Sequence, residues 1–406
     1  MNMLDFMLAL ANYAFHFLRV LGAFGVAAGC GFGGQAMATQ ADSERLLIRA
    51  ARLFDGKELR IDRAVLVAGS EIVAIGSPAE LRGRAVREMD LGDATLMPGF
   101  IELHAHLAFR KVPREIVLRH GVTTVRDVGG PLLPPSGGRG ALRLLTAGPI
   151  ITVQNGYPIS VFGKGYIAET AQSPEEARQL VGKLVEGGAV VIKIALEPGG
   201  EPGAPWSMGH HGGAHPPWPL SSLDVVSAIV AEAHRLGRRV TAHLGESQGA
   251  ALALAAGIDE WAHVPCSEIS DELIEQAVRQ KVKIVTTFDT MSHCSGIHTN
   301  AARLAKLGAV FLYGAEIAHP DIPWGIDAQE LQLMRHFTGM STLEVLRSAT
   351  SKAGDELGMT PLGTLSPGAP ADIIAVRGNP FEDLKILEYP ALVISGGQIV
   401  VNEFDK

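Results

Sequence analysis

The sequence predicts an α/β protein: a (β/α)8 TIM barrel that carries a small β-sandwich domain built from both ends of the chain. The middle segment, 98–357, alternates candidate strands with helical patterns. Eight strands, each followed by a helix, in about 260 residues are typical of a (β/α)8 barrel. The segments 44–97 and 361–402 are composed of short strands and turns. The chain is 47% hydrophobic and 19% charged, with 47 glycines, which fits a globular α/β core.

The strands expected in the middle segment are short apolar runs. They read FIELHAHL, VTTVRD, PIITV, VVIKIAL, RVTAHL, DEWAHV, KIVTTF and AVFLYGAE. Helical patterns lie between them, for example at 174–186, 221–236 and 270–280, and Ser173 followed by Pro174 is typical of a helix N-terminus. A doubly wound sheet is the competing fold, but its glycine-rich phosphate loop does not follow the first strand.

The two end segments have the same character. LLIRAARLF and AVLVAGSEIVAIG, near the start, are separated by turn signals such as Asp55-Gly56, and ADIIAVRG and PALVISGGQIVV lie near the end. We therefore expect one composite β-domain with the barrel inserted into it.

Residues 1–40 form a leader of different composition. Arg19, the apolar run VLGAFGVAA and then Ala36-Met37-Ala38 have the order of a secretory signal peptide, which would make the protein periplasmic or secreted. The stretch ending at Cys30, AAGC, resembles a bacterial lipoprotein box and would place a lipid anchor on that cysteine. A spanning helix ranks last, because His16 and Arg19 would lie near the middle of the bilayer. A disordered leader or a misassigned start codon is the remaining alternative, and the protein would then be cytoplasmic.

The net charge of −8 argues against a nucleic-acid-binding protein, which needs a clustered basic face. We expect a small-molecule substrate and leave the oligomeric state open. The three cysteines are too few for a disulfide scaffold. Cys266 and Cys294 follow neighbouring strands and either form a disulfide in an exported protein or remain free buried thiols.

Two histidines of one predicted strand are the first candidate metal ligands. In LMPGFIELHAHL, His104 and His106 are two residues apart, so both side chains leave the strand on the same face and can share one cation. Alone, such a pair is more often packed or solvated than a metal ligand.

Other strand ends of the barrel carry residues of the same kind. His243 ends VTAHL, His263 ends EWAH, and Glu316 ends LYGAE, while Lys193 lies inside the apolar strand VVIKIAL. The active site of a (β/α)8 barrel lies at the C-terminal ends of its strands. Histidines suit transition metals such as zinc, and a lysine in an apolar strand is costly to bury unless it is paired or modified. Hydrogen-bonded histidines and an ordinary ion pair explain each residue singly, but they do not explain the whole set.

These residues resemble the amidohydrolase superfamily, in its imidazolonepropionase/Xaa-Pro-dipeptidase-like branch. PGFIELHAHL, the strand-four lysine, TAHLGES, WAHV, HGVTTVRDVGG and GTLSPGAPADIIAVRGNP carry the resemblance, which covers about 45–402. It implies two divalent metal ions, taken as zinc. His104 and His106 would bind one ion together with Glu316. His243 and His263 would bind the other, and carboxylated Lys193 would bridge the two.

The resemblance also implies the reaction. A metal-bound hydroxide would attack the carbonyl of an amide or cyclic amide, including that of a dipeptide, and Glu316 would pass the proton to the leaving amine. One residue departs from the family pattern, because the family has Asp where this chain has Glu316. Three outcomes follow: the Glu acts from a shifted backbone, the number of metals changes, or catalysis is lost. Asp321 ranks lower as a substitute acid.

The alternatives to an amide hydrolase keep the same scaffold. They are a lactone or ester hydrolase, a catalytically silent metal- or ligand-binding protein and, less favoured, a decarboxylase or isomerase. Loops after the strands decide the substrate. The loop at 197–220 has six Gly and six Pro in 24 residues and is either a binding loop or a surface insertion. The substrate-binding candidates from these loops are Tyr157, His210, His211, His215 and His293.

Overall fold

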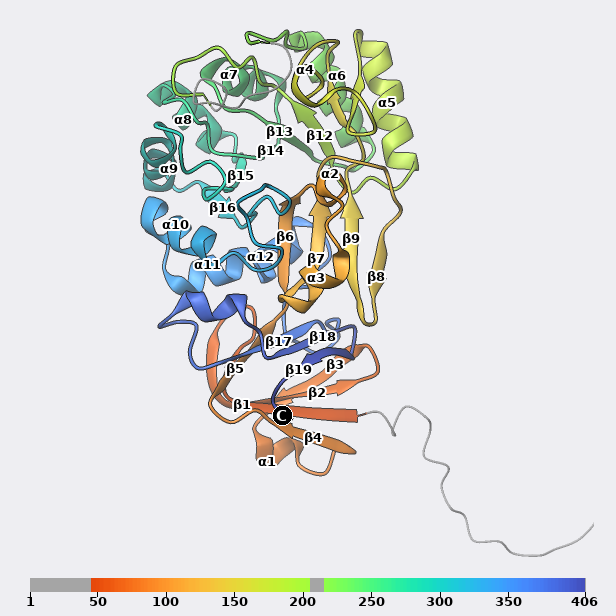
Figure 1. Ribbon diagram of the computed structural model, residues 1–406, viewed down its shortest axis with the longest axis vertical. Helices are drawn as coiled ribbons and strands as arrows, with labels where there is room; N and C mark the ends of the chain where they lie inside the picture. The colour runs from red at the N-terminus through yellow and green to blue at the C-terminus, as the bar shows by residue number, and fades with distance from the viewer. Residues whose placement is uncertain (1–44, 205–214, 406) are drawn as a thin grey trace, which may run out of the picture. The chain divides into compact units, whose positions relative to one another are not determined.

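The computed structural model describes residues 45–204 and 215–405 (Figure 1). The predicted leader, with Cys30, lies outside the described residues, as do His210 and His211. Among the described helices, none combines the length and the apolar character that crossing a bilayer requires.

Strands from both ends of the chain form one mixed eight-stranded sheet, in the order β19-β18-β17-β5-β1-β2-β3, with β4 paired to β1. Its strands are β1 (Arg45–Phe54), β2 (Leu59–Ala68), β3 (Glu71–Gly76), β4 (Arg87–Asp90), β5 (Ala94–Pro98), β17 (Ile373–Arg377), β18 (Leu392–Ser395) and β19 (Gln398–Asn402). The antiparallel register between β17 and β5, with Ile373 opposite Pro98, joins the two end segments directly. The structure thus shows one composite sheet, while a two-layered sandwich remains a prediction.

Parallel strands of the middle segment form two further sheets (Figure 1). The four-stranded sheet, in the order β6-β7-β9-β8, contains β6 (Phe100–Ala105), β7 (Val122–Asp127), β8 (Ser136–Gly138) and β9 (Ala141–Thr146). The seven-stranded sheet, in the order β11-β10-β12-β13-β14-β15-β16, contains β10 (Ile150–Thr152), β11 (Ala168–Thr170), β12 (Ile192–Ala195), β13 (Val240–His243), β14 (Glu260–Trp261), β15 (Lys283–Val285) and β16 (Val310–Leu312). Each of the eight predicted strands overlaps one of these, and β8, β9 and β11 are additions.

The predicted ring of eight strands is not closed by continuous ladders. The end of β6 and the segment that follows β16 meet at an isolated parallel bridge between Ala105 and Ile317. The carboxylate of Glu102, on β6, accepts hydrogen bonds from the backbone N–H of Ala315 at 3.0 and 3.1 Å. A side chain therefore takes the place of the backbone partner that a β6–β16 ladder would supply at that position.

Most of the described helices follow strands of the middle segment, whereas two short ones, at 78–81 and 384–388, lie between strands of the composite sheet. The helices are α1 (Pro78–Leu81), α2 (Leu107–Arg110), α3 (Arg114–Arg119), α4 (Ile159–Phe162), α5 (Pro174–Glu186), α6 (Leu223–Arg235), α7 (Ser247–Ala256), α8 (Asp271–Arg279), α9 (Ile297–Lys306), α10 (Ala328–Thr338), α11 (Thr342–Ser348), α12 (Ser351–Glu356) and the 3-10 helix η3 (Leu384–Glu388). The Ser173 side chain accepts a hydrogen bond from the Glu176 N–H and caps α5, as its sequence predicts. Residues of these helices and strands form one continuous hydrophobic core beneath the strand ends.

Candidate metal centre

β6 presents the first histidine pair. The strand is buried along its whole length, and His104 and His106 leave it on one face, as the two-residue spacing predicts. Their Nε2 atoms lie 3.2 Å apart. From β12, the Nζ atom of Lys193 lies 3.4 Å from the Nε2 atom of His104.

β13 and the segment after β14 present the second pair. His243 is the last residue of β13, and His263 lies two residues beyond the end of β14. The Nδ1 atom of His243 lies 2.9 Å from the Nε2 atom of His263. The ring centroids of His104 and His263 are 4.7 Å apart, so the two pairs lie next to each other.

Glu316, beyond the end of β16, joins the first pair. Its Oε1 atom lies 3.9 Å from the Nε2 atom of His106. One ligand atom each from His104, His106 and Glu316 lies within 4.8 Å of the others, as in a metal-binding group. The backbone of Glu316 has a φ of 65°, in the left-handed region that residues other than glycine and asparagine rarely adopt. The Glu carboxylate therefore reaches the histidines from an unusual backbone conformation.

Burial keeps the first histidine pair and His263 neutral. It lowers the pKa of His106 to about 3 and holds the pKa values of His104 and His263 well below the usual range, with nearby Lys193 as a further cause. Burial also lowers the pKa of Lys193 to about 7. It raises the pKa of Glu316 to about 7, against the opposing attraction of Lys193. Neutral imidazoles offer the lone pairs that a metal ion requires.

The donor set fits a divalent metal centre. Two nitrogen ligands about 2.0–2.1 Å from one tetrahedral zinc ion are roughly 3.3–3.4 Å apart. The separations of 3.2 Å in the first histidine pair and 2.9 Å in the second are close to this. The Oε2 atom of Glu316 is buried without a hydrogen-bond partner among the described residues. Such a convergence of buried nitrogen and oxygen atoms is stabilised by a cation.

Three residues that support the centre were not among the sequence candidates. The Oε1 atom of Glu102 accepts a hydrogen bond from the His104 N–H at 2.6 Å, and the Thr287 hydroxyl lies 2.7 Å from the Nδ1 atom of His263. The Oε2 atom of buried Glu197 lies 3.6 Å from the Nε2 atom of His243. Glu102 shares the face of His104 and His106 on one strand, a spacing that the sequence shows. The positions of Glu197 and Thr287 depend on how separate loops meet.

A pocket of about 110 Å³ opens onto these residues. Its lining combines four residues of the centre with aromatic and apolar side chains and one arginine: His106, Phe109, Arg110, Ile150, Tyr157, Pro158, Phe162, Lys193, His243, Glu316, Ala318, His319 and Pro320. Tyr157 therefore lies where the sequence analysis expected a substrate-binding residue. His215 and His293 are exposed and do not line this pocket.

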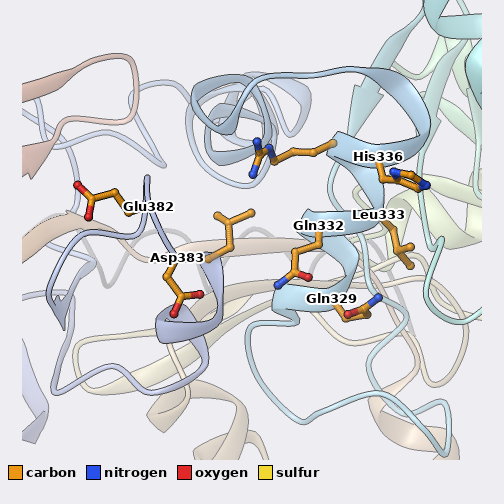
Figure 2. Close-up of a pocket in the computed structure, with 8 residues that line it drawn as sticks. Gln329, Gln332, Leu333, His336, Glu382 and Asp383 are labelled. Carbon is orange, nitrogen blue, oxygen red and sulfur yellow. The ribbon is translucent and has the colours of Figure 1, made fainter.

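A larger pocket, of about 570 Å³, lies between α10 and the segment before η3. Figure 2 shows Gln329, Gln332 and His336 of α10 on one side of this pocket, with Glu382 and Asp383 on the other. None of the predicted site residues lines it. Four of the candidate metal ligands line the smaller pocket, and none of them lines the larger one.

Cys266 and Cys294 form a disulfide with a Cα–Cα distance of 4.9 Å. It joins the segments that follow β14 and β15, three residues after His263 and seven after Thr287. Of the two predicted alternatives, the structure shows the bonded form.

The chain is similar to known proteins in sequence and in fold. The sequence model of the Amidohydrolase family matches residues 95–400. An ochratoxinase from Aspergillus niger is 26% identical over 431 aligned residues, which cover 88% of this chain and 86% of the relative. The fold resembles a crystal structure of a Xaa-Pro dipeptidase with bound methionine, with a TM-score of 0.70, 21% identity and coverage of 87% of this chain and 99% of that one. It also resembles molinate hydrolase, with a TM-score of 0.67, 18% identity and coverage of 90% and 96%.

The match spans most of the chain and includes β6, β12, β13, β14 and β16, the strands that carry or precede the candidate ligands. Members of the matched family are hydrolases of carbon–nitrogen bonds, such as those of amides and dipeptides, and use a divalent metal centre. The chain therefore belongs to the amidohydrolase family and is a hydrolase that acts on carbon–nitrogen bonds.

Proposed function

We propose that the protein is a metal-dependent amidohydrolase that cleaves an amide or cyclic-amide C–N bond, with dipeptides among its substrates. One observation carries the proposal: His106, Lys193, His243 and Glu316 line one pocket, and His104 and His263 lie beside them. The dipeptidase among the similar structures supports the dipeptide as a substrate.

The proposed ligands divide into two sets. His104, His106 and Glu316 hold one divalent ion, and His243 and His263 hold the other, both taken as zinc. When bound, such ions lower the pKa of water and polarise a carbonyl. Lys193, once carboxylated, would supply anionic oxygen ligands to these ions. Burial supports this modification, because it favours the uncharged amine, which adds carbon dioxide to give a carbamate and a proton.

Glu316 is the proposed acid–base residue. Its carboxylate lines the pocket and lies beside His106, so it can accept a proton from water and donate it to the leaving nitrogen. This corresponds to the first of the three outcomes for the Asp-to-Glu departure: the longer side chain acts from a shifted backbone.

A closed barrel and a two-layered β-sandwich are part of the same proposal. We take 98–357 as an eight-stranded barrel that closes across β6 and β16, and 44–97 with 361–402 as a β-sandwich domain. The likeness to the dipeptidase structure along 87% of the chain supports this assignment.

We also propose export to the periplasm or beyond, with a mature chain that begins at lipidated Cys30 or near Thr39. The disulfide between Cys266 and Cys294 supports export, because such bonds persist in oxidising compartments. The proposed partner is a small-molecule substrate, and the only membrane contact is the lipid anchor. Mass spectrometry of protein from its native host is expected to find neither Met1 nor Asn2 at the N-terminus.

A panel of substrates tests the function. We expect turnover of dipeptides, N-acyl amino acids or cyclic amides that stops when a chelator removes the metal. Faster turnover of lactones than of every amide would instead favour the ester-hydrolase alternative. Full metal occupancy without turnover across the panel would favour the silent binding protein.

A further inference from the structure

One buried side chain joins two ligand-bearing segments of the centre. Glu102, on β6, is fully buried, and its Oε1 atom accepts a hydrogen bond from the His104 N–H at 2.6 Å. Its two carboxyl oxygens also accept the Ala315 N–H, at 3.0 and 3.1 Å. A single carboxyl group therefore contacts the backbone of the first histidine pair and the backbone directly before Glu316.

The same two segments meet again on the other side of Glu316. The His106 N–H donates a hydrogen bond to the Ile317 carbonyl at 3.0 Å, next to the bridge between Ala105 and Ile317. Glu316 thus lies between a contact that a side chain makes, at Ala315, and a contact that the backbone makes, at Ile317. Its left-handed φ of 65° occurs between these two contacts. A residue other than glycine keeps such a conformation only where its surroundings hold it.

The segment before Glu316 packs closely on its neighbours. A Cβ added to Gly314 would lie 3.0 Å from the Cβ of His104 and 2.4 Å from the Cγ1 of Val285. The backbone at this position therefore lies directly against β6. Loss of the Glu102 contact would free the segment to move away from β6, because the space on the inner side is already filled.

We propose that Glu102 is a positioning residue for Glu316. By holding the Ala315 N–H, its carboxyl group fixes the distance between the Glu316 carboxylate and the histidines of β6. Glu102 does not line the pocket, so it acts through Glu316 and not on the substrate. The consequence for proton transfer rests on the proposed function, whereas the positioning itself does not.

The length of the Glu102 side chain allows its two contacts to be separated. The bond from the His104 N–H is local, two residues along the chain, and an aspartate side chain makes bonds of this kind as well. The bond from the Ala315 N–H spans 213 positions. Glu102→Asp is therefore expected to keep the first bond and to break the second. Because this variant retains the carboxyl group, its effect reports reach and not charge.

Amide hydrogen exchange, measured by NMR on the full-length protein with and without zinc, tests the positioning without any turnover. Glu102→Asp is expected to speed the exchange of the Ala315 N–H by roughly 10- to 100-fold, the range for a buried donor that loses its partner. The exchange of the His104 N–H should stay unchanged. Unchanged exchange at Ala315 would exclude the contact, and an equal increase at both amides would show general loosening. Either result would overturn the proposal.

Two further variants control this experiment. Glu330→Gln is the matched control, because Glu330 is also fully buried and accepts a backbone hydrogen bond, from Asp289 at 2.8 Å, but has no printed contact with the segment before Glu316. It should leave the exchange of the Ala315 N–H unchanged, and an increase equal to that in Glu102→Asp would contradict the proposal. Glu102→Gln keeps the side-chain length and one acceptor oxygen, so its effect at Ala315 should be smaller than that of Glu102→Asp.

A double-mutant cycle connects the positioning to catalysis. On the best substrate of the panel, Glu102→Asp is expected to lower kcat by at least about tenfold with little change in KM, since the tolerance of such a site is about half an ångström. The loss should be much smaller in a Glu316→Asp background, whose carboxylate is already displaced. Equal losses in both backgrounds would show that Glu102 acts independently of Glu316 and would refute the proposal. If no amide is hydrolysed but the exchange differences hold, the proposed function fails and the positioning role stands.

Discussion

The Oε2 atom of Glu197 lies 3.6 Å from the Nε2 atom of His243, whose Nδ1 atom lies 2.9 Å from the Nε2 atom of His263. One nitrogen of His243 is thus directed to the proposed metal and the other to a buried carboxylate. Such an arrangement fixes the tautomer and the orientation of a ligating histidine. We therefore expect Nδ1 to be the ligand atom of His243.

Glu197→Gln is expected to weaken metal binding at the His243–His263 pair by roughly 10- to 100-fold, because the histidine loses its anionic partner. Competition with a chelator, followed by elemental analysis, measures this loss. Glu201→Gln is the control from the same loop, since its carboxylate accepts hydrogen bonds from Ser247, Gln248 and Ser267 instead. Equal metal affinity in the wild type and the Glu197 variant would exclude this positioning role.

Glu316→Asp is expected to lower kcat/KM by at least about tenfold, because a shortened carboxylate is displaced from a site that tolerates only about half an ångström. The Glu316 carboxylate lies beside His106 while the backbone at position 316 is left-handed. Steady-state kinetics on the best substrate of the panel measure the change. Activity that arises only in the Asp variant would instead identify the natural protein as catalytically silent.

The disulfide is expected to contribute about 3–4 kcal/mol to the free energy of unfolding, because it closes a loop of 28 residues in the unfolded chain. Chemical denaturation of the Cys266→Ala/Cys294→Ala double variant, compared with the wild type under oxidising conditions, measures this contribution. Both proteins should have the same stability in a strong reductant. A difference that persists there would assign the effect to packing of the two buried side chains.

Glu330 is expected to make stability depend on pH. Burial raises the pKa of this carboxyl well above its usual 4.5, so the folded protein retains a proton that the unfolded chain loses. The stabilisation is complete below about pH 4.5 and is lost as the pH rises toward the raised pKa, by up to about 1.4 kcal/mol per pH unit.

Glu330→Gln replaces the protonated acid by a neutral group of the same shape. The free energy of unfolding of this variant, relative to the wild type, should therefore increase as the pH is raised from 5 to 8. Denaturation at several pH values, with the exposed Glu58→Gln as the control, measures the trend. A constant difference across this range would show that Glu330 does not carry the dependence.

Much of the centre could be predicted because its residues occur at recognisable places in the sequence. The two-residue spacing of His104 and His106 predicts one strand face, and their Nε2 atoms lie 3.2 Å apart. Lys193 stands out as a charge within an apolar strand, and its Nζ atom lies beside His104. The helix predicted at 174–186 has those bounds in the structure, because a serine cap and a proline mark its start.

The remaining features depend on contacts between distant segments. The bond from Ala315 to Glu102, which replaces a strand ladder, joins residues 213 positions apart. The approach of Glu197 to His243 and the left-handed backbone of Glu316 likewise arise only in the folded chain. Local propensity does not encode such arrangements. The sequence therefore predicts the ligand types better than it predicts the residues that orient them.

The central claim is that six side chains, from five strands and the segments that follow them, hold two divalent ions. Elemental analysis of the purified wild type and of Lys193→Ala, both reconstituted with zinc, tests it most directly. The account predicts about two zinc ions per chain in the wild type and fewer in the variant, which lacks the bridging group. A wild type that binds no metal, or a variant that retains two ions, would contradict it.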